Sequence, residues 1–288
     1  MTTLRAAAGQ AVAVAGDIAA NVVIAAELAS EAGERGARLL VLPEAFVTGY
    51  CRAAFAGPLP TESALPPLLE PLSAAASDHA LTVVVSSPLD RGGRRTLSTV
   101  VVAADGSVTV PYDKQHLSGY EKDHFVAGDH GASILVDGWE FGLGICYDAS
   151  FPEHARDAAL HGAHGYLVSA AFFPGGAARR DLYAAARALD NGMYVVFSGL
   201  VGPCGDEELI GGSAIYDPEG VALDRVADGR GLAVAELDLT AVRRTRERHP
   251  MLRERRVDLG PRTLGPPERR SQSTTASAGG ASTVTGSS

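Results

Sequence analysis

The 288-residue chain has few cysteines and no long apolar segment. Its three cysteines, Cys51, Cys146 and Cys204, are too few for a disulfide framework and are typical of a reducing compartment. No apolar run reaches the ~18 residues that a membrane-spanning helix needs. The N-terminus also lacks the basic region and apolar stretch of a signal peptide. We therefore expect a cytoplasmic protein that is not inserted in a membrane.

The sequence also lacks the common signatures of bound metals, phosphates and nucleic acids. It contains no CxxC or HExxH pattern and no glycine-rich phosphate loop. His161 and His164 have a His-x-x-His spacing, but no cysteine or carboxylate cluster accompanies them. The net charge of −9 disfavours nucleic acid. Ten arginines between residues 243 and 270 are expected to pair with the acidic remainder of the chain. We predict no metal, no cofactor and no nucleic-acid partner.

Two stretches of the chain repeat the same order of elements. In each, an alanine-rich helix leads through a short turn into an apolar strand, and a second helix and strand follow. The first stretch places these elements at 17–37, 38–43, 62–79 and 81–87, and the second at 153–163, 165–170, 177–191 and 193–199. A duplicated order of elements indicates two halves of similar structure.

The strands of the first half carry apolar residues without alternation. Val83–Val85 and Val100–Val102 are examples, and such runs are expected where both faces of a sheet are covered. We predict an α/β fold in which two sheets pack face to face between outer helices, a four-layer α-β-β-α sandwich built from two similar halves. From the residues alone, one doubly wound sheet is the alternative.

The composition changes near Gly265. Residues 271–288 are Ser, Thr, Ala, Gly and Gln with a single valine. Such a segment has too little apolar surface to offset its ordering entropy. We predict one domain over residues 1–264 and a disordered low-complexity tail over 265–288.

Cys146 ends an apolar, glycine-punctuated run and is followed by a polar turn and an alanine-rich helix. A side chain in that position lies at a pocket mouth, where a helix N-terminus favours a thiolate or an oxyanion. A buried structural cysteine is the alternative. Glu44 and Lys114 likewise stand just beyond β-rich runs, and this favours one shared site.

The three residue types suit attack on a carbonyl or nitrile carbon. The thiol needs a base, donors for the developing oxyanion and a pocket that limits water. Glu44 is the candidate base, because a carboxylate can take the proton of the thiol. A lysine beside it stays protonated, so Lys114 is the candidate oxyanion stabiliser. His116, two residues beyond Lys114, is the alternative base.

Several segments resemble the nitrilase superfamily of carbon–nitrogen hydrolases, and together they cover about residues 4–258. The matching segments are Leu42–Glu44, Thr48–Tyr50, Tyr112–Leu117, Glu121 with Phe125 and Gly128, Gly144–Asp148, Phe151–Glu153, Ala186–Asn191 and Gly212–Pro218. The resemblance implies the α-β-β-α sandwich. It also implies a Glu44 base, a Lys114 transition-state stabiliser and a Cys146 nucleophile. Glu121 would position the substrate or support the lysine, and the Tyr147 N–H would complete the oxyanion hole with Lys114.

The residues after the cysteine bear on the bond that is cleaved. Members that cleave nitriles tend to have Trp-Glu there, whereas Tyr147 and Asp148 look like the amidase and N-carbamoyl amidohydrolase branches. We predict hydrolysis of a small amide that releases ammonia or an amine through a thioester acyl-enzyme. The alternatives are carbamoyl hydrolysis, amide or acyl transfer in a specialised biosynthetic pathway, and then nitrile hydrolysis. Ser198 and Gly199 stand where many members have an asparagine, which weakens any transfer of substrate by analogy.

Four residues placed after strand ends are candidate walls of the substrate pocket: Tyr50, Ala171, Phe172 and Phe173. Core packing is the alternative for the two phenylalanines. Arg179 and Arg180 begin a predicted helix and could meet an acidic substrate or lie at the surface.

Two hypotheses from other classes remain at this point. One is a binding protein without activity, and the other is a redox sensor that pairs Cys146 with Cys51 or Cys204. The resemblance further implies a homodimer or a higher homo-oligomer.

Overall fold

The computed structural model describes residues 2–263 and 265. Residues 2–254 form one compact unit that contains all helices and strands of the described chain. Residues 255–263 and 265 contain no helix or strand. The predicted tail at 265–288 lies outside the described residues except for Gly265. No helix in the described part of the chain is long and apolar enough to cross a membrane.

The first six-stranded sheet contains the strands of the first half and the last strand of the chain. Its order is β14 (Gly231–Asp238), β1 (Thr3–Gln10), β2 (Leu39–Val41), β3 (Thr82–Asp90), β4 (Arg95–Val102) and β5 (Val108–Asp113). Strands β1, β2 and β3 are parallel, and the other pairs are antiparallel. Because β14 pairs with β1 along eight residue pairs, the end of the second half is tied to the first.

The second six-stranded sheet repeats this plan. Its order is β13 (Ala222–Arg225), β12 (Ala214–Tyr216), β9 (Tyr194–Gly199), β8 (Gly165–Ala170), β7 (Trp139–Ile145) and β6 (Ser133–Val136). Here β7, β8 and β9 are parallel, as β1, β2 and β3 are, and two antiparallel strands follow in both sheets. The two similar halves predicted from the repeated order of elements are therefore confirmed.

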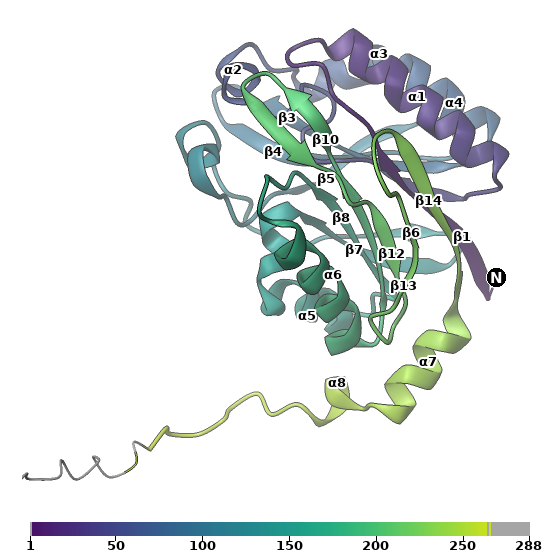
Figure 1. The fold of residues 1–288 in the computed structure, drawn as a ribbon, viewed down its shortest axis with the longest axis vertical. Coiled ribbons are helices and arrows are strands. Elements are labelled where there is room, and N and C mark those ends of the chain that lie inside the picture. The colour runs from purple at the N-terminus through teal and green to yellow at the C-terminus, as the bar shows by residue number, and fades with distance from the viewer. Residues whose placement is uncertain (1, 264, 266–288) are drawn as a thin grey trace, which may run out of the picture. The chain divides into compact units, whose positions relative to one another are not determined.

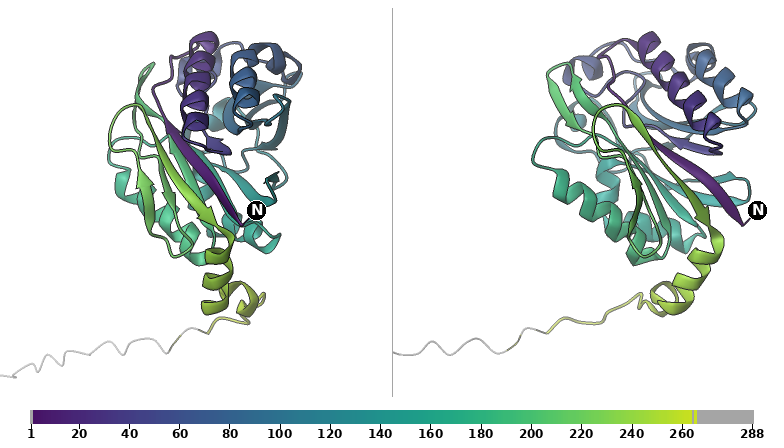
Figure 2. Two further views of the ribbon diagram at one scale, coloured as in Figure 1. Left: turned by 90° about the vertical axis from the view of Figure 1, so that its right-hand side faces the viewer. Right: turned by 45° about the vertical axis from the view of Figure 1, so that its right-hand side comes forward.

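The sheets pack face to face, with β1 against β9 and β2 against β8 and β9, and helices cover their outer faces (Figures 1 and 2). On the first sheet lie α1 (Ile18–Glu34), α3 (Leu65–Leu68) and α4 (Glu70–Asp78), and on the second lie α5 (Pro152–Leu160) and α6 (Ala177–Asn191). This is the predicted α-β-β-α sandwich, and the doubly wound alternative is wrong because the strands form two separate sheets. Helices α7 (Leu239–Arg248) and α8 (Met251–Glu254) follow β14.

One expected helix is broken. Residues 62–79 form a 3₁₀ turn at Glu62–Ala64, the short α3 and then α4, with Leu69 between the two helices. Prolines 66, 67 and 71 account for the break, because proline lacks the N–H that a helix interior requires. Helix α1, in contrast, starts where its sequence suggests, since the Asp17 side chain caps the N–H of Ala20 at 3.0 Å.

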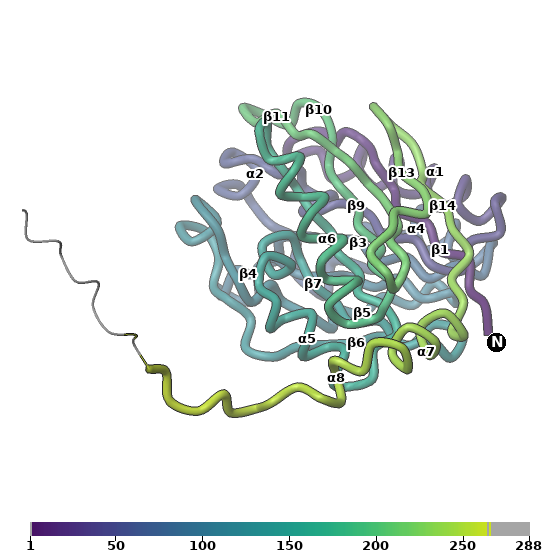
Figure 3. Tube along the Cα trace, turned by 60° about the horizontal axis from the view of Figure 1, so that its bottom comes forward, coloured from purple at the N-terminus to yellow at the C-terminus, as the bar shows by residue number. Residues whose placement is uncertain are grey.

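A short hairpin outside both sheets lies beside a segment from the first half of the chain. Strands β10 (Val201–Cys204) and β11 (Glu207–Ile210) form the hairpin, and α2 (Arg52–Ala56) lies near it in the trace of Figure 3. A Cβ built on Gly205, in the hairpin turn, would approach the Cys51 sulfur to 2.8 Å. The hairpin is therefore packed closely against the residue that precedes α2.

Candidate active site

The three residues expected to share a site follow strands of both sheets. Glu44 lies three residues beyond β2, Lys114 directly follows β5, and Cys146 directly follows β7. The backbone N–H of Glu44 donates to the carbonyl of Ala170, the last residue of β8, at 3.4 Å. Strand ends of the two sheets therefore meet at this point, as is usual for sites in α/β proteins.

Lys114 bridges two glutamates in a fully buried cluster. Its Nζ lies 2.6 Å from Oε1 of Glu44 and 2.6 Å from Oε1 of Glu121, and none of the three side chains is exposed. A lysine ammonium has three N–H donors, so one remains for another acceptor. The Oε2 atom of Glu44 has no hydrogen-bond partner among the described residues. The cluster thus offers one free donor and one free acceptor.

Glu121 is itself held by neighbouring donors. It lies in the 3₁₀ turn Gly119–Asp123. The Tyr50 hydroxyl donates to its Oε1 at 2.6 Å, and the backbone N–H of Ser118 donates to its Oε2 at 2.8 Å. These contacts fix the carboxylate that anchors Lys114.

The charges of the cluster perturb one another. Burial raises the pKa of Glu44 to about 8, because the ionised carboxylate loses its hydration and the attraction of Lys114 compensates only in part. Burial alone would lower the pKa of Lys114, but the two neighbouring carboxylates outweigh it and raise the pKa. Lys114 therefore stays protonated at neutral pH, while the proton on Glu44 can be exchanged near neutral pH.

Cys146 occupies a turn with an unusual backbone. Its φ is +43°, in the left-handed region that non-glycine residues seldom adopt, and it begins the 3₁₀ turn Cys146–Ser150. Burial and the Glu44 charge raise the pKa of the thiol well above its usual value, while its Sγ lies 3.5 Å from the carbonyl oxygen of Ala171. The resting group is a neutral thiol, which must lose its proton during the reaction.

The backbone N–H of Tyr147 lies in the first turn of that 3₁₀ segment. Donors in a first turn have no partner within their own helix, so this N–H is available to a ligand. The Tyr147 side chain is half-exposed and packs edge-on against Phe151, with ring centroids 5.0 Å apart. The residue can therefore present its N–H beside Cys146.

Cys146 opens into a cavity of about 490 Å³. Three of the predicted wall residues, Ala171, Phe172 and Phe173, line it together with Tyr147. Tyr50 does not; its buried ring contacts Phe173 at a centroid distance of 5.9 Å, and its hydroxyl supports Glu121. The cavity therefore combines aromatic wall residues with the Cys146 thiol.

The two arginines at the start of α6 have different environments. Arg180 is buried and donates to Asp181 at 2.7 Å and to the carbonyl of Gly211 at 2.9 Å. Arg179 is exposed and lines the cavity. Tyr183 also lines it and was not predicted. Its position four residues after Arg179 on an expected helix was a usable signal, because such residues share a helix face.

The other two cysteines are buried and lie near each other. Burial raises the pKa of Cys204 to about 12, and the neighbouring Cys51 adds to the shift. Both are free thiols. The structure thus places Cys51 beside Cys204 rather than in a pair with Cys146.

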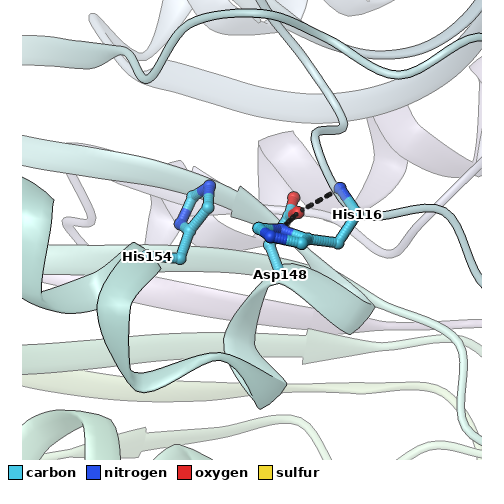
Figure 4. A group of neighbouring side chains, drawn as sticks. All are labelled: His116, Asp148 and His154. Carbon is cyan, nitrogen blue, oxygen red and sulfur yellow. Dashed lines mark hydrogen bonds and ion pairs between the residues drawn. The ribbon is translucent and has the colours of Figure 1, made fainter.

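A second polar cluster includes Asp148 of the turn Cys146–Ser150 together with two histidines (Figure 4). His116, Asp148 and His154 offer ligand atoms within 4.8 Å of one another, a spacing that a metal ion could use. Most of those atoms already make hydrogen bonds, however, and His116 donates toward Asp148 rather than toward Cys146. No contact in the described part of the chain joins His116 to Cys146, so the geometry offers no support for His116 as the base.

Comparison with known proteins finds relatives that match nearly the whole of the compact unit. Residues 5–247 match the family model for the carbon-nitrogen hydrolases. An (R)-stereoselective amidase from a Pseudomonas species is 33% identical over 236 residues, which cover 81% of this chain and 85% of the relative. A deaminated glutathione amidase of Escherichia coli O157:H7 is 32% identical, and the match covers 82% of this chain and 91% of that protein.

A solved structure with the same fold is the amidase of Nesterenkonia sp. AN1. A double mutant in complex with acrylamide superposes with a TM-score of 0.79 at 28% identity, covering 89% of this chain and 95% of that one. In a second structure of the same amidase, the acetamide moiety of fluoroacetamide is covalently added at the active-site cysteine.

Proposed function

Because this chain belongs to the carbon–nitrogen hydrolase family, we propose that Glu44, Lys114 and Cys146 are the catalytic residues of its amidase reaction. The activity itself is the cysteine-dependent hydrolysis of a small amide. The observation that carries the assignment is the buried Lys114 ammonium, held at 2.6 Å by both Glu44 and Glu121 next to the only cysteine that lines the 490 Å³ cavity.

The geometry suggests a reaction order. The Cys146 sulfur attacks the amide carbon while its proton passes to the free Oε2 of Glu44. The oxyanion accepts the unused N–H of Lys114 and the backbone N–H of Tyr147. Glu44 then gives its proton to the departing ammonia or amine. A water molecule, deprotonated by Glu44, hydrolyses the thioester and restores the thiol.

Cysteine substitution tests the assignment. Cys146→Ala should abolish ammonia release from a panel of small primary amides, N-carbamoyl compounds and nitriles. Cys51→Ala is the matched control, since that thiol is buried and does not line the cavity. Turnover by Cys146→Ala at the wild-type rate would overturn the scheme. Among the substrate classes, the largest kcat/KM should belong to the amides, with carbamoyl compounds second and nitriles third.

We further propose that the substrate carries a carboxylate away from its amide. Among the described residues that line the cavity, Arg179 is the one that carries a charge, and it makes no ion pair or hydrogen bond with any other described residue. The neighbouring Arg180, in contrast, is held by protein groups. A guanidinium left unpaired beside a reactive thiol is suited to an anionic group of the substrate, because arginine binds carboxylates through two parallel N–H donors.

The test compares a neutral amide with an amide of equal length that ends in a carboxylate. Arg179→Gln should lower kcat/KM for the acidic amide about 10- to 100-fold, the usual range for a hydrogen bond to a charged group, and leave the neutral amide unchanged. Arg35→Gln, at an exposed arginine that does not line the cavity, is the control. Equal kinetics for both substrates with wild-type enzyme would contradict the proposal.

Three further expectations belong with this proposal: a catalytic domain over residues 1–264, a cytoplasmic location, and a homodimer or higher homo-oligomer. Exposed leucines on the outer helices of the second sheet support assembly, with Leu182 68% and Leu189 46% exposed on α6 and Leu160 41% exposed on α5. Light scattering after size exclusion would test this, and a strict monomer would contradict it.

A further inference from the structure

We propose that Asp148 is a positioning residue. It holds the turn Cys146–Ser150 in register with the segment around Lys114, through a network of hydrogen-bonded polar groups that ends at His116. The inference rests on the proposed catalytic roles of Cys146 and Lys114. It concerns groups that contact neither the substrate nor the reacting atoms, so Asp148 acts through the residues it holds.

The Asp148 carboxylate is fully buried and accepts four hydrogen bonds. Its Oδ1 accepts from the backbone N–H of His116 at 2.8 Å and from the His116 ring at 2.8 Å. Its Oδ2 accepts from the Tyr112 hydroxyl at 2.7 Å and from the backbone N–H of Ile145 at 3.0 Å. One carboxylate thus satisfies donors from two separate segments of the chain.

Those two segments are the ones that carry the proposed catalytic groups. Ile145 directly precedes Cys146, while Tyr112 and His116 lie two residues on either side of Lys114. Asp148 therefore links the turn of the thiol to the loop of the ammonium.

The donor and the acceptor of each hydrogen bond in this polar network can be assigned. Tyr112 donates its hydroxyl proton to Asp148, so at 2.9 Å it accepts from Nε2 of His154. The other ring nitrogen, Nδ1 of His154, then accepts from the buried Tyr166 hydroxyl at 2.8 Å. His154 is accordingly neutral, and burial lowers its pKa in agreement with this assignment.

The network reaches solvent at His116, whose side chain is partly exposed. Although burial alone would raise it, the pKa of Asp148 lies below its usual value, because hydrogen bonds from His116 and Tyr112 favour the ionised form. His116 therefore donates from Nδ1 to an ionised carboxylate, stacks on Phe151 at a centroid distance of 3.9 Å, and lines a second cavity of about 600 Å³. In Figure 4 the dashed lines from His116 end on the Asp148 carboxylate, and His154 lies to the left of both residues.

The hydrogen bonds already made by these side chains favour a positioning role over a metal site. Both ring nitrogens of His154 and both oxygens of Asp148 are engaged, so His116 Nε2 is the one ligand atom of the trio with no partner in the described structure. A metal ion would have to displace several of these bonds.

The nucleophile requires such support. Residues other than glycine in the left-handed region are strained and persist only when their surroundings hold them. Cys146 has φ +43°, and the bond from Ile145 N–H to Asp148 fixes the Gly144–Ile145 peptide, one residue ahead of the Cys146 turn. If this bond is lost, the turn can relax and move the sulfur away from the ammonium. A displacement of about 1 Å can lower the rate about 100-fold.

Asp148→Asn is the first test. The asparagine amide replaces one carboxylate oxygen with an NH₂ group. Because both oxygens of Asp148 accept hydrogen bonds, the NH₂ group would face donors and those hydrogen bonds would be lost. We expect kcat for a small amide to fall about 100-fold with little change in KM. The rate of Cys146 alkylation by iodoacetamide should fall as well. Asp157→Asn, at an exposed carboxylate of the same second cavity, should leave both unchanged.

A pair of variants at His116 keeps the test independent of folding. His116→Asn retains an N–H donor near the Nδ1 position, whereas His116→Ala has none. We expect the alanine variant to lose at least tenfold in kcat and the asparagine variant to recover most of it, with similar melting temperatures.

The possible outcomes separate the two proposals. Equal kcat and equal alkylation rates in His116→Ala, His116→Asn and the wild type would overturn the positioning role, even if amide hydrolysis is confirmed. Wild-type enzyme that hydrolyses no amide would overturn the catalytic proposal, while the alkylation rates would still decide the role of Asp148. Activation by Zn²⁺ that depends on His116 would overturn positioning in favour of a metal site.

Discussion

The buried Glu44 should make the enzyme lose activity below pH 8. In the proposed scheme Glu44 must be ionised to accept the thiol proton, and burial raises the pKa of Glu44 to about 8. Below that pH the ionised fraction falls tenfold per unit, so kcat/KM at pH 6 should be about 100-fold below its plateau. Lys114 should add no alkaline limb below about pH 10, since its pKa is raised above its ordinary value.

The assay is ammonia release from a neutral amide such as butyramide, whose own charge does not change over this range. The enzyme is returned to pH 8.5 after each measurement to show that the loss is reversible. A flat profile between pH 6 and 8, or a limb near pH 4.5, would refute the assignment of Glu44 as a buried base.

Glu121→Gln tests the physical cause of the expected loss of activity below pH 8, the acid limb of the pH profile. The negative charge of Glu121 contributes to the raised pKa of Glu44, so its removal should lower that pKa and move the acid limb to lower pH. The same change replaces the charged 2.6 Å partner of Lys114 with a neutral amide, so the plateau should fall too. An acid limb that stays in place or moves to higher pH would show that the interaction between these carboxylates has been misassigned.

Three other substitutions probe the same framework. Lys114→Met should lower kcat about 100- to 1,000-fold through loss of an oxyanion donor, and a variant within threefold of wild type would contradict that role. Tyr50→Phe removes one 2.6 Å hydrogen bond to Glu121 and should lower kcat by about two- to tenfold while Tm changes little; an unchanged kcat would show that Glu121 does not need this donor. Gly144→Ala would place a Cβ 2.0 Å from the Tyr166 hydroxyl in a buried strand. We expect urea titrations to show a loss of about 1–3 kcal/mol in the free energy of unfolding. Gly131→Ala is the control, since its Cβ would meet only Asp157 at 3.4 Å, and it should unfold like the wild type.

The sequence was sufficient for the architecture and for the strand-end residues. The duplicated order of helices and strands, together with apolar runs such as Val83–Val85, led to two covered sheets. Glu44 and Cys146 were found because each follows such a run. The break in the helix predicted over 62–79 was also readable from its prolines and was missed.

The protonation states and the supporting contacts could not be read in the same way. The neutral thiol of Cys146 follows from its burial and from the charge of Glu44, which is 102 positions away in the chain. Asp148 and Tyr112 are 36 residues apart and meet only after the two sheets pack. A pattern of local residue types contains no information on such distances, so the burial and the hydrogen-bond partners of these residues had to come from the structure.

The division of the site between the two sheets has a practical consequence. Glu44, Lys114 and Glu121 precede the exposed segment 129–131, and Cys146 follows it, while β14 pairs with β1 across that boundary. A chain cut within this segment would yield two fragments, neither of which contains all of the proposed catalytic residues. Their reassociation would restore ammonia release, so the divided enzyme could serve as a complementation reporter that converts the proximity of two fused proteins into a chemical signal.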